Sequence, residues 1–164
     1  MGAGYDSTYF WIKDLEAEGT FPALSGMSYF EVDYPEVVQK KIKIIKDNEK
    51  LSKYVWDGSD TKEPSLDAIN AKHFKIFGAD LRNTERLSEA LSAAGAQQNV
   101  PTLILTECVL IYLKPEDSKK ILTFAKDFFT GDLLFLNYEM IHPSDPFGRV
   151  MLENLEVTTN TNHL

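Results

Sequence analysis

Apolar residues recur at two spacings along the chain, and each spacing predicts an element. Residues 28–33 form a β-prone run, and apolar positions between Val37 and Ile45 then repeat with helical spacing. Pro35 stands where this helix should begin, a position where its missing N–H group would have no intrahelical partner. The pattern predicts a strand that leads directly into a helix.

A polar stretch, residues 47–72, follows this helix. It is rich in turn-forming residues and carries one small apolar cluster, made of Leu51, Val55 and Trp56. We therefore expect residues 47–72 to form a long connection between two regular elements.

The strand and helix pattern then returns. Residues 73–80 are a second strand candidate, and Thr84 stands where it can cap a helix whose apolar face runs from Leu87 to Ala94. The pair repeats the arrangement of residues 28–45. Repetition of this unit is typical of α/β proteins.

The most apolar run, residues 101–110, predicts a central strand buried on both faces of a parallel sheet. Pro115 opens another helix, residues 131–140 supply a further strand, and apolar positions from Phe147 to Leu155 indicate a last helix. Four strand candidates alternating with helices predict an open α/β sheet with right-handed crossovers.

The chain opens on a glycine-rich turn, Gly2-Ala3-Gly4-Tyr5-Asp6, of a kind that should follow a strand. No strand candidate stands in front of this turn. We therefore read residues 1–164 as a single partial domain, the core of an α/β fold that lacks its first strand.

Charge limits the classes of partner. The chain has 17 Lys and Arg against 25 Asp and Glu, a formal net charge of −8, which disfavours binding to nucleic acid or to an anionic membrane. The longest apolar run, residues 102–113, is interrupted by Glu107 and is too short to span a bilayer. No signal peptide pattern is present.

Cysteine and histidine usage points to the compartment and to the absence of a metal. The single cysteine, Cys108, cannot form an internal disulfide, which favours a reducing, cytoplasmic location. His73, His142 and His163 lack the spacing of metal ligands, so we assign no metal.

Acids end three successive strand candidates: Asp33, Asp80 and Glu107. Ligands of open α/β sheets bind beyond the carboxyl ends of the strands, so we expect these carboxylates to line one crevice. Glycines at positions 2 and 4 let the backbone approach a ligand closely, and Asp33 is placed to accept both hydroxyls of a ribose. The pattern predicts a nucleoside site.

Each of these signals has a structural alternative. Asp33 precedes a helix and is alternatively a helix cap, and Glu107 interrupts an apolar run and is alternatively half of a buried ion pair. NAD is disfavoured because the third glycine of the dinucleotide fingerprint falls at Ser7, and because the acid lies about thirty instead of about twenty positions on. A cationic ligand such as S-adenosylmethionine suits an acidic crevice better.

Six stretches of the chain resemble the leucine carboxyl methyltransferase family. They are residues 2–11, 29–33, 78–82, 106–112, 137–139 and 145–155, and they occur in the family's order. The resemblance implies a Rossmann-like S-adenosylmethionine-dependent methyltransferase core, with the first strand and the last strands missing. It also implies methylation of the C-terminal leucine carboxylate of type 2A protein phosphatase catalytic subunits, whose tail would be the partner.

The resemblance also implies roles for individual residues. The Gly2 backbone would meet the methionine part of the cofactor, in the turn where Gly4 also lets the backbone approach a ligand. Asp33 would bind the ribose, Asp80 and Leu81 the adenine, and Glu107 would lie near the methionine portion. Tyr112 would lie near the acceptor as the catalytic candidate, with a packed aromatic as its alternative.

A terminal carboxylate has a pKa of about 3.5 and needs no general base to become a nucleophile, so positioning should dominate this chemistry. The family places cationic side chains ahead of the glycine turn, and this chain does not contain them, so we expect residues 1–164 alone not to transfer methyl groups. Two further hypotheses are a small-molecule carboxylate O-methyltransferase and a non-catalytic domain that binds the cofactor or the phosphatase.

Overall fold

The computed structural model describes residues 1–20, 26–56 and 65–161, with side chains as far as residue 156. It divides into two compact units, Met1–Gln97 and Gln98–Leu164, and each unit is considered by itself below. Assignment of the whole chain to one domain stays a prediction.

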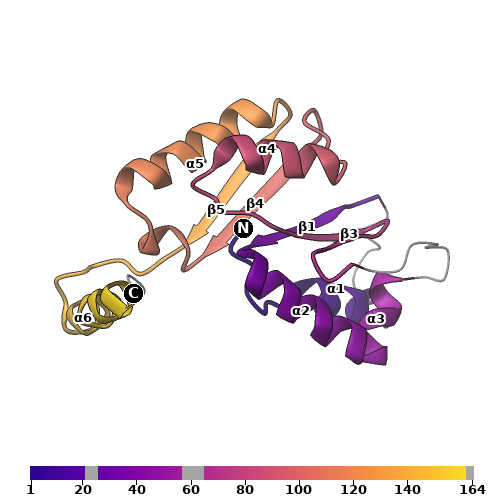
Figure 1. Ribbon diagram of the computed structural model, residues 1–164, viewed down its shortest axis with the longest axis horizontal. Coiled ribbons are helices and arrows are strands. Elements are labelled where there is room, and N and C mark those ends of the chain that lie inside the picture. The colour runs from indigo at the N-terminus through magenta and orange to yellow at the C-terminus, as the bar shows by residue number, and fades with distance from the viewer. Residues whose placement is uncertain (21–25, 57–64, 162–164) are drawn as a thin grey trace. The chain divides into compact units, whose positions relative to one another are not determined.

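The first unit contains a mixed sheet with strand order β1-β3-β2, and Figure 1 labels β1 and β3 of this sheet. Strand β1 (Tyr29–Asp33) runs parallel to β3 (Phe74–Gly78), in a register that places Asp33 beside Gly78. Strand β2 (Ala68–Asn70) pairs antiparallel with the other edge of β3. The two parallel strands therefore end side by side, as the sequence pattern predicted.

Helix α2 (Pro35–Asp47) starts at the predicted proline and covers this sheet with an apolar stripe. Val38, Ile42 and Ile45 on that stripe are fully buried, and each such side chain stabilises the fold by about 1.5 to 3 kcal/mol. A Cβ on Gly78 would lie 2.8 Å from the Cα of Pro35, so the end of β3 requires a glycine where it passes the start of α2.

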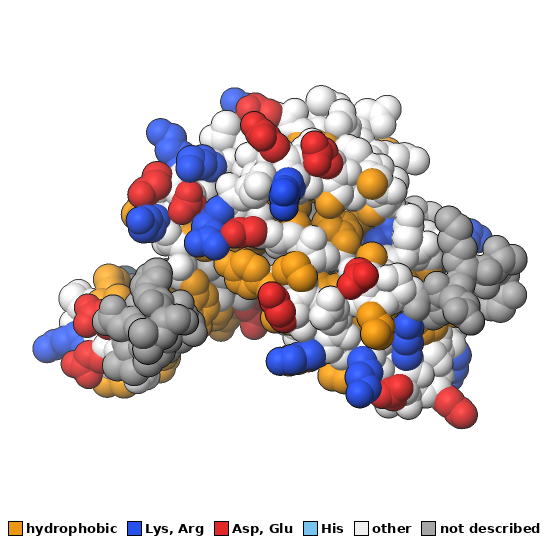
Figure 2. All heavy atoms as spheres, viewed as in Figure 1, with side chains coloured by type: hydrophobic (Ala, Val, Ile, Leu, Met, Phe, Trp, Pro, Cys, Tyr) orange, Lys and Arg blue, Asp and Glu red, His pale blue; other side chains and the backbone are white. Residues whose placement is uncertain are grey.

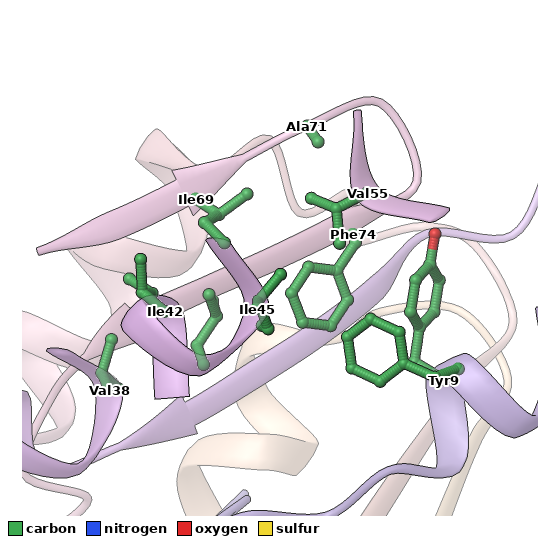
Figure 3. Packing of buried hydrophobic residues seen from close by; sticks show 10 residues of the cluster. Tyr9, Val38, Ile42, Ile45, Val55, Ile69, Ala71 and Phe74 are labelled. Carbon is green, nitrogen blue, oxygen red and sulfur yellow. The ribbon is translucent and has the colours of Figure 1, made fainter. Parts of the chain in front are cut away.

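Two further helices complete this core, which Figure 3 shows from close by. Helix α1 (Thr8–Ala17) contributes Tyr9, whose ring lies 4.6 Å from that of Phe74, and α3 (Glu49–Val55) contributes Val55. The Tyr9 hydroxyl donates a hydrogen bond to the Tyr54 carbonyl oxygen at 2.9 Å. The core thus joins α1, α2, α3 and the sheet.

The sequence pattern did not predict α1, α3 or β2. The expected long connection was wrong for its described parts, because residues 49–55 form a helix and residues 68–70 form a strand, whereas residues 57–64 lie outside the described residues. Helix α1 is as long as α4 (Thr84–Ala93), but its buried side chains, Tyr9 and Phe10, are adjacent and give no helical repeat. Helix α3 and strand β2 are short, with seven and three residues, and the N-cap of α3, Asn48, accepts hydrogen bonds from two backbone N–H groups. Short elements that depend on tertiary contacts leave a weak periodic signal.

Helix α4 (Thr84–Ala93) lies where it was predicted and buries Leu87 and Leu91. Its cap was assigned wrongly to Thr84. Asn83 is the N-cap, and its side-chain oxygen accepts from the N–H group of Arg86 at 3.1 Å, while Thr84 is already helical. Both residue types are good caps, so the boundary moved by one position.

The second unit contains two parallel strands, β4 (Thr102–Glu107) and β5 (Leu133–Tyr138). A short 3-10 helix, η1 (Leu110–Tyr112), and α5 (Pro115–Phe128) connect them, and α6 (Pro146–Thr161) follows β5. Figure 1 shows α5 running alongside this pair of strands. The predicted order of strands and helices is confirmed here.

Burial on both faces of β4 was wrong. Ile104 and Thr106 are buried, but Leu103 is 60% exposed, and Leu134, its neighbour on β5, is 64% exposed. Side chains alternate between the two faces of a strand, so one face of this sheet is covered and the other is an apolar surface that no described residue of this unit covers. Among the described strands, β4 pairs with β5 alone and β1 with β3 alone.

Candidate functional site

A tight turn at the start of the chain lies against the carboxyl end of β1. Gly2 and Gly4 have φ angles of 67° and 46°, in the left-handed region that favours glycine. The Gly2 N–H group donates to the Val32 carbonyl oxygen at 2.7 Å, and the Gly4 N–H group donates to Asp33 Oδ2 at 2.7 Å. A Cβ on Gly4 would meet no atom of the described residues within 4 Å, so this part of the turn faces open space.

Asp33 holds this turn and does not cap helix α2. Its Oδ1 accepts from the Tyr34 N–H group at 2.7 Å, and the N-cap of α2 is Tyr34, which makes no side-chain cap bond. The helix-cap alternative is therefore wrong. Because each carboxylate oxygen accepts more than one hydrogen bond, Asp33 retains capacity for the hydroxyls of a ligand.

A buried ion pair supports the other end of the turn. Lys41 on α2 donates from Nζ to the Asp6 carbonyl oxygen at 2.7 Å and lies 2.5 Å from Glu31 Oε2 on β1. Both side chains are buried. Burial raises the pKa of Glu31 to about 7, against the opposing effect of the Lys41 ammonium. The turn is thus held at Gly4 by Asp33 and at Asp6 by Lys41.

Sequence reasoning missed this pair, although one signal was present. Lys41 falls within the apolar stripe of α2, between Val38 and Ile42, where a charged residue needs a buried partner. Its partner is ten positions away on a strand, and helical periodicity does not identify such a partner.

Asp80 and Leu81 follow β3 at the same end of the sheet. Ala79 donates its N–H group to the Asp33 carbonyl oxygen at 2.8 Å, which ties this segment to the end of β1. Arg82 binds both carboxylate oxygens of Asp80, with its Nη2 atom 2.6 Å from Oδ2, and these hydrogen bonds lower the pKa of Asp80. Leu81 is buried, with 8% of its surface exposed.

Glu107 and Tyr112 lie in the second unit. Glu107 is exposed because it shares the uncovered face of β4 with Leu103, so the alternative that it is half of a buried ion pair was wrong. Tyr112 is 51% exposed in η1, so the packed-aromatic alternative was also wrong.

The first unit therefore brings together five of the predicted cofactor-binding residues: Gly2, Gly4, Asp33, Asp80 and Leu81. They belong to the glycine turn and to the ends of β1 and β3. A crevice that also includes Glu107 stays a prediction.

Another acid, Glu139, holds the segment that carries Tyr112. Its Oε1 accepts from the N–H groups of Val109, Leu110 and Ile111, at 3.0, 2.9 and 3.3 Å. Residues 137–139 carry part of the family resemblance, but the sequence pattern indicated no role for Glu139. Since the contact spans about thirty positions, spacing alone gives no signal for it.

Two features of the described residues bear on the class of protein. No group of three or more His, Cys, Asp or Glu side chains in the described part could hold a metal ion, and His163 lies outside that part. No helix among the described residues is long and apolar enough to cross a membrane. The fold and the turn define an α/β protein in which a glycine turn and acids gather at the ends of parallel strands.

Comparisons with known proteins narrow this class. Residues 1–126 match the model of the leucine carboxyl methyltransferase family. The chain is 38% identical over 158 residues to leucine carboxyl methyltransferase 1 of Rattus norvegicus, covering 94% of this chain and 45% of the relative. It is 37% identical to the leucine carboxyl methyltransferase 1 homolog of Arabidopsis thaliana, covering 95% of this chain and 44% of the relative.

A relative with a different name matches over nearly the whole chain. The tRNA wybutosine-synthesizing protein 4 of Homo sapiens is 34% identical over 163 residues, which cover 99% of this chain and 23% of that protein. The chain belongs to the leucine carboxyl methyltransferase family. It spans a little under half the length of the leucine carboxyl methyltransferases that it matches, and the predicted α/β fold class is confirmed.

Proposed function

We propose that this chain forms the cofactor-binding part of an S-adenosylmethionine-dependent enzyme that methylates the C-terminal leucine carboxylate of type 2A protein phosphatase catalytic subunits. The observation that carries the proposal is the open glycine turn fixed by Asp33, at the ends of two parallel strands. Family membership and the names of the rat and plant relatives support the reaction.

The residues present fit this cofactor. The backbone at Gly2 and Gly4 can approach the methionine part, because no side chain of the described residues covers the turn at Gly4. Asp33 has acceptor capacity for two ribose hydroxyls. Asp80 and Leu81 would adjoin the adenine, and Glu107 would adjoin the methionine portion.

When bound, S-adenosylmethionine supplies a methyl group on a positively charged sulfur. The acceptor, a terminal carboxylate with a pKa of about 3.5, is already ionised at neutral pH, so no residue of the chain has to remove a proton. The protein's task is to orient the carboxylate oxygen toward the methyl group and to exclude water, and orientation contributes roughly 7 to 11 kcal/mol in favourable cases. Tyr112, with its exposed hydroxyl-bearing ring, is the residue proposed to contact the acceptor.

The partner in this proposal is the phosphatase tail, and neither nucleic acid nor a membrane is included. The net charge of −8 opposes binding to a phosphate backbone, and Figure 2 shows acidic and basic side chains interspersed on the face in view. A cytoplasmic location is also proposed, because Cys108 is an exposed free thiol of a kind that persists in reducing compartments.

A second candidate acceptor has a specific observation in its favour. The match to the human tRNA wybutosine-synthesizing protein 4 covers more of this chain than the match to the rat enzyme does. A tRNA-linked acceptor would require basic surface, which the acidic composition does not favour. The experiment below also includes a small-molecule acid as acceptor and a domain that binds the cofactor without turnover.

Mass spectrometry of acceptor peptides tests the proposal. Residues 1–164 would be assayed alone and also grafted in place of the matching residues of the rat relative, each with S-adenosylmethionine and a phosphatase tail peptide ending in leucine. The control peptide carries a C-terminal amide, and parallel samples contain tRNA or small carboxylic acids.

We expect the graft to add one methyl group to the free-acid peptide and none to the amide. Methylation of the tRNA or of a small acid in place of the peptide would overturn the proposed acceptor. Cofactor binding without transfer to any acceptor would favour a non-catalytic role.

A further inference from the structure

Three successive residues at the end of β5 and just beyond it, residues 137–139, accept hydrogen bonds from the end of β4 and the segment that follows it. Thr106, which is fully buried, donates from Oγ1 to Asn137 Oδ1 at 2.7 Å. Cys108 then donates its N–H group to the Tyr138 carbonyl oxygen at 2.9 Å. The third residue is Glu139, so residues 137–139 hold residues 106–111 in order.

The contact at Glu139 differs from the other two because one atom holds three donors. Its Oε1 lies 3.0, 2.9 and 3.3 Å from the backbone nitrogens of Val109, Leu110 and Ile111. Three consecutive N–H groups converge on one point only when the backbone curls around it. A side chain from another strand therefore fixes the shape of this segment.

The backbone just before this segment is strained. Cys108 has a φ angle of 49°, in the left-handed region that a residue with a side chain rarely adopts. Such a conformation persists where the surrounding structure imposes it, and it concentrates at functional sites. Here Tyr138 accepts the hydrogen bond of the Cys108 N–H group, and Glu139 accepts that of the next residue, Val109.

The segment held in this way has Glu107 at one end and Tyr112 at the other. Both side chains are exposed, so packing in a core does not fix them. Their direction is set by the backbone between them, and residues 109–111 of that backbone are bound by Glu139. This residue is itself half-buried, and its other oxygen, Oε2, is buried without a hydrogen-bond partner in the described part of the chain.

We propose that Glu139 is a positioning residue of the site, which acts by holding the backbone of residues 109–111 and so sets the direction of Glu107 and Tyr112. The catalytic roles of Glu107 and Tyr112 rest on the proposed function. The hydrogen bonds by which Glu139 holds residues 109–111 are independent of the proposed function.

Amide hydrogen exchange, followed by NMR in residues 1–164, tests the holding step. Glu139→Leu removes the acceptor while keeping a side chain of similar size, Glu139→Gln keeps an acceptor oxygen, and Glu153→Leu on the exposed part of α6 is the matched control. In Glu139→Leu we expect exchange at Val109, Leu110 and Ile111 to accelerate by about tenfold or more while Ile104 in β4 stays protected.

Glu139→Gln should restore most of the protection, and Glu153→Leu should leave it unchanged. Equal protection at residues 109–111 in all of these proteins would overturn the proposal. Loss of protection at Ile104 as well in Glu139→Leu would also overturn it, because Glu139 would then stabilise the unit as a whole.

The catalytic step is tested separately, with the same variants in the graft on the rat relative. We expect Glu139→Leu to lower kcat by about tenfold with a smaller change in the KM for the cofactor, and Glu139→Gln to recover most of the loss. An unchanged kcat, despite accelerated exchange, would show that the segment is held but plays no part in positioning. If the graft without these substitutions transfers no methyl group, the proposed function fails, while the exchange experiment still decides whether Glu139 holds the segment.

Discussion

In each of the two units, a carboxylate near the end of a strand holds a neighbouring backbone segment by hydrogen bonds. In the first, the acid at the end of β1, Asp33, accepts a hydrogen bond from the Gly4 N–H group, and the buried Lys41 donates one to the Asp6 carbonyl oxygen. In the second, Glu139 at the end of β5 binds three N–H groups of the segment after β4. In both, a carboxylate just at or beyond a strand end fixes a backbone segment proposed to meet the ligand.

What surrounds the two turns differs. The first unit has a closed core, in which Phe74 and Ile42 are fully buried between the sheet and its helices. The second unit has a two-stranded sheet with Leu134 and Leu136 exposed on one face. Local hydrogen bonds can therefore shape a turn in either unit. The free energy of unfolding of the unit that carries the turn depends instead on how much apolar surface the unit buries.

The largest effect is expected when a side chain of the closed core and one of the exposed sheet face are each replaced by alanine. Phe74→Ala should lower the free energy of unfolding by about 3 to 5 kcal/mol, because it empties the centre of the closed core. Leu134→Ala should change it by about 0.5 kcal/mol or less, because the side chain is already exposed to solvent. Denaturant unfolding followed by circular dichroism measures both, and a large loss in Leu134→Ala would mean that this face is covered in solution.

The next effect concerns the buried ion pair. Lys41→Met should lower the free energy of unfolding of the first unit by about 3 to 5 kcal/mol, because it removes the ion-pair partner of the buried Glu31 carboxylate. Both tryptophans, Trp11 and Trp56, lie in this unit, so their fluorescence reports its unfolding. The double variant Glu31→Gln with Lys41→Met is the control and should recover most of the loss; an equal loss in the double variant would contradict the assignment.

A smaller effect is expected from pH. Glu31 has a folded-state pKa of about 7, above its ordinary value of 4.5. Between these two pH values the folded state holds a proton on Glu31 that the unfolded state has lost, so the folded state loses stability as the pH rises through this range. The difference corresponds to roughly 3 kcal/mol. Glu31→Gln should flatten this decline in unfolding free energy measured from pH 4.5 to pH 7.

The Met1 amino group interacts with Glu31. Burial lowers the pKa of the Met1 amino group and the Glu31 carboxylate acts against that effect, so Glu31→Gln should lower this pKa further, which also acts to flatten the decline. A decline of the same steepness in Glu31→Gln would assign the pH dependence to other groups.

Periodicity predicted those elements that are long or strongly apolar. The order from β1 through α2, β3, α4, β4, α5 and β5 to α6 was predicted, because each of these elements carries a full strand run or several helical turns. The short elements α3 and β2 were missed, and so was α1, whose ten residues bury only the adjacent Tyr9 and Phe10, since contacts between distant segments hold all three.

The site was predictable in part, for the same reason. Strand-end acids and glycines are local signals, so Gly4 and Asp33 were found, and the structure joins them by a hydrogen bond. Glu31 with Lys41, and Glu139 with its three amides, are contacts across the fold that local spacing does not encode. Glu107 was misjudged as lying against a core because an apolar sequence run does not show whether both faces of a strand are covered.

Titration calorimetry of S-adenosylmethionine with Asp33→Ala tests most directly the claim that the glycine turn and Asp33 form a cofactor site. The substitution removes the acceptor of the Gly4 N–H group and the proposed acceptor of both ribose hydroxyls, so the dissociation constant should rise by about tenfold or more, with Asp33→Asn falling in between. Circular dichroism should show that all three proteins are folded. Measurable binding by the unsubstituted chain with an unchanged dissociation constant in folded Asp33→Ala would contradict the assignment of Asp33 to the ribose, and absence of binding by the unsubstituted chain would contradict a cofactor site formed by these residues alone.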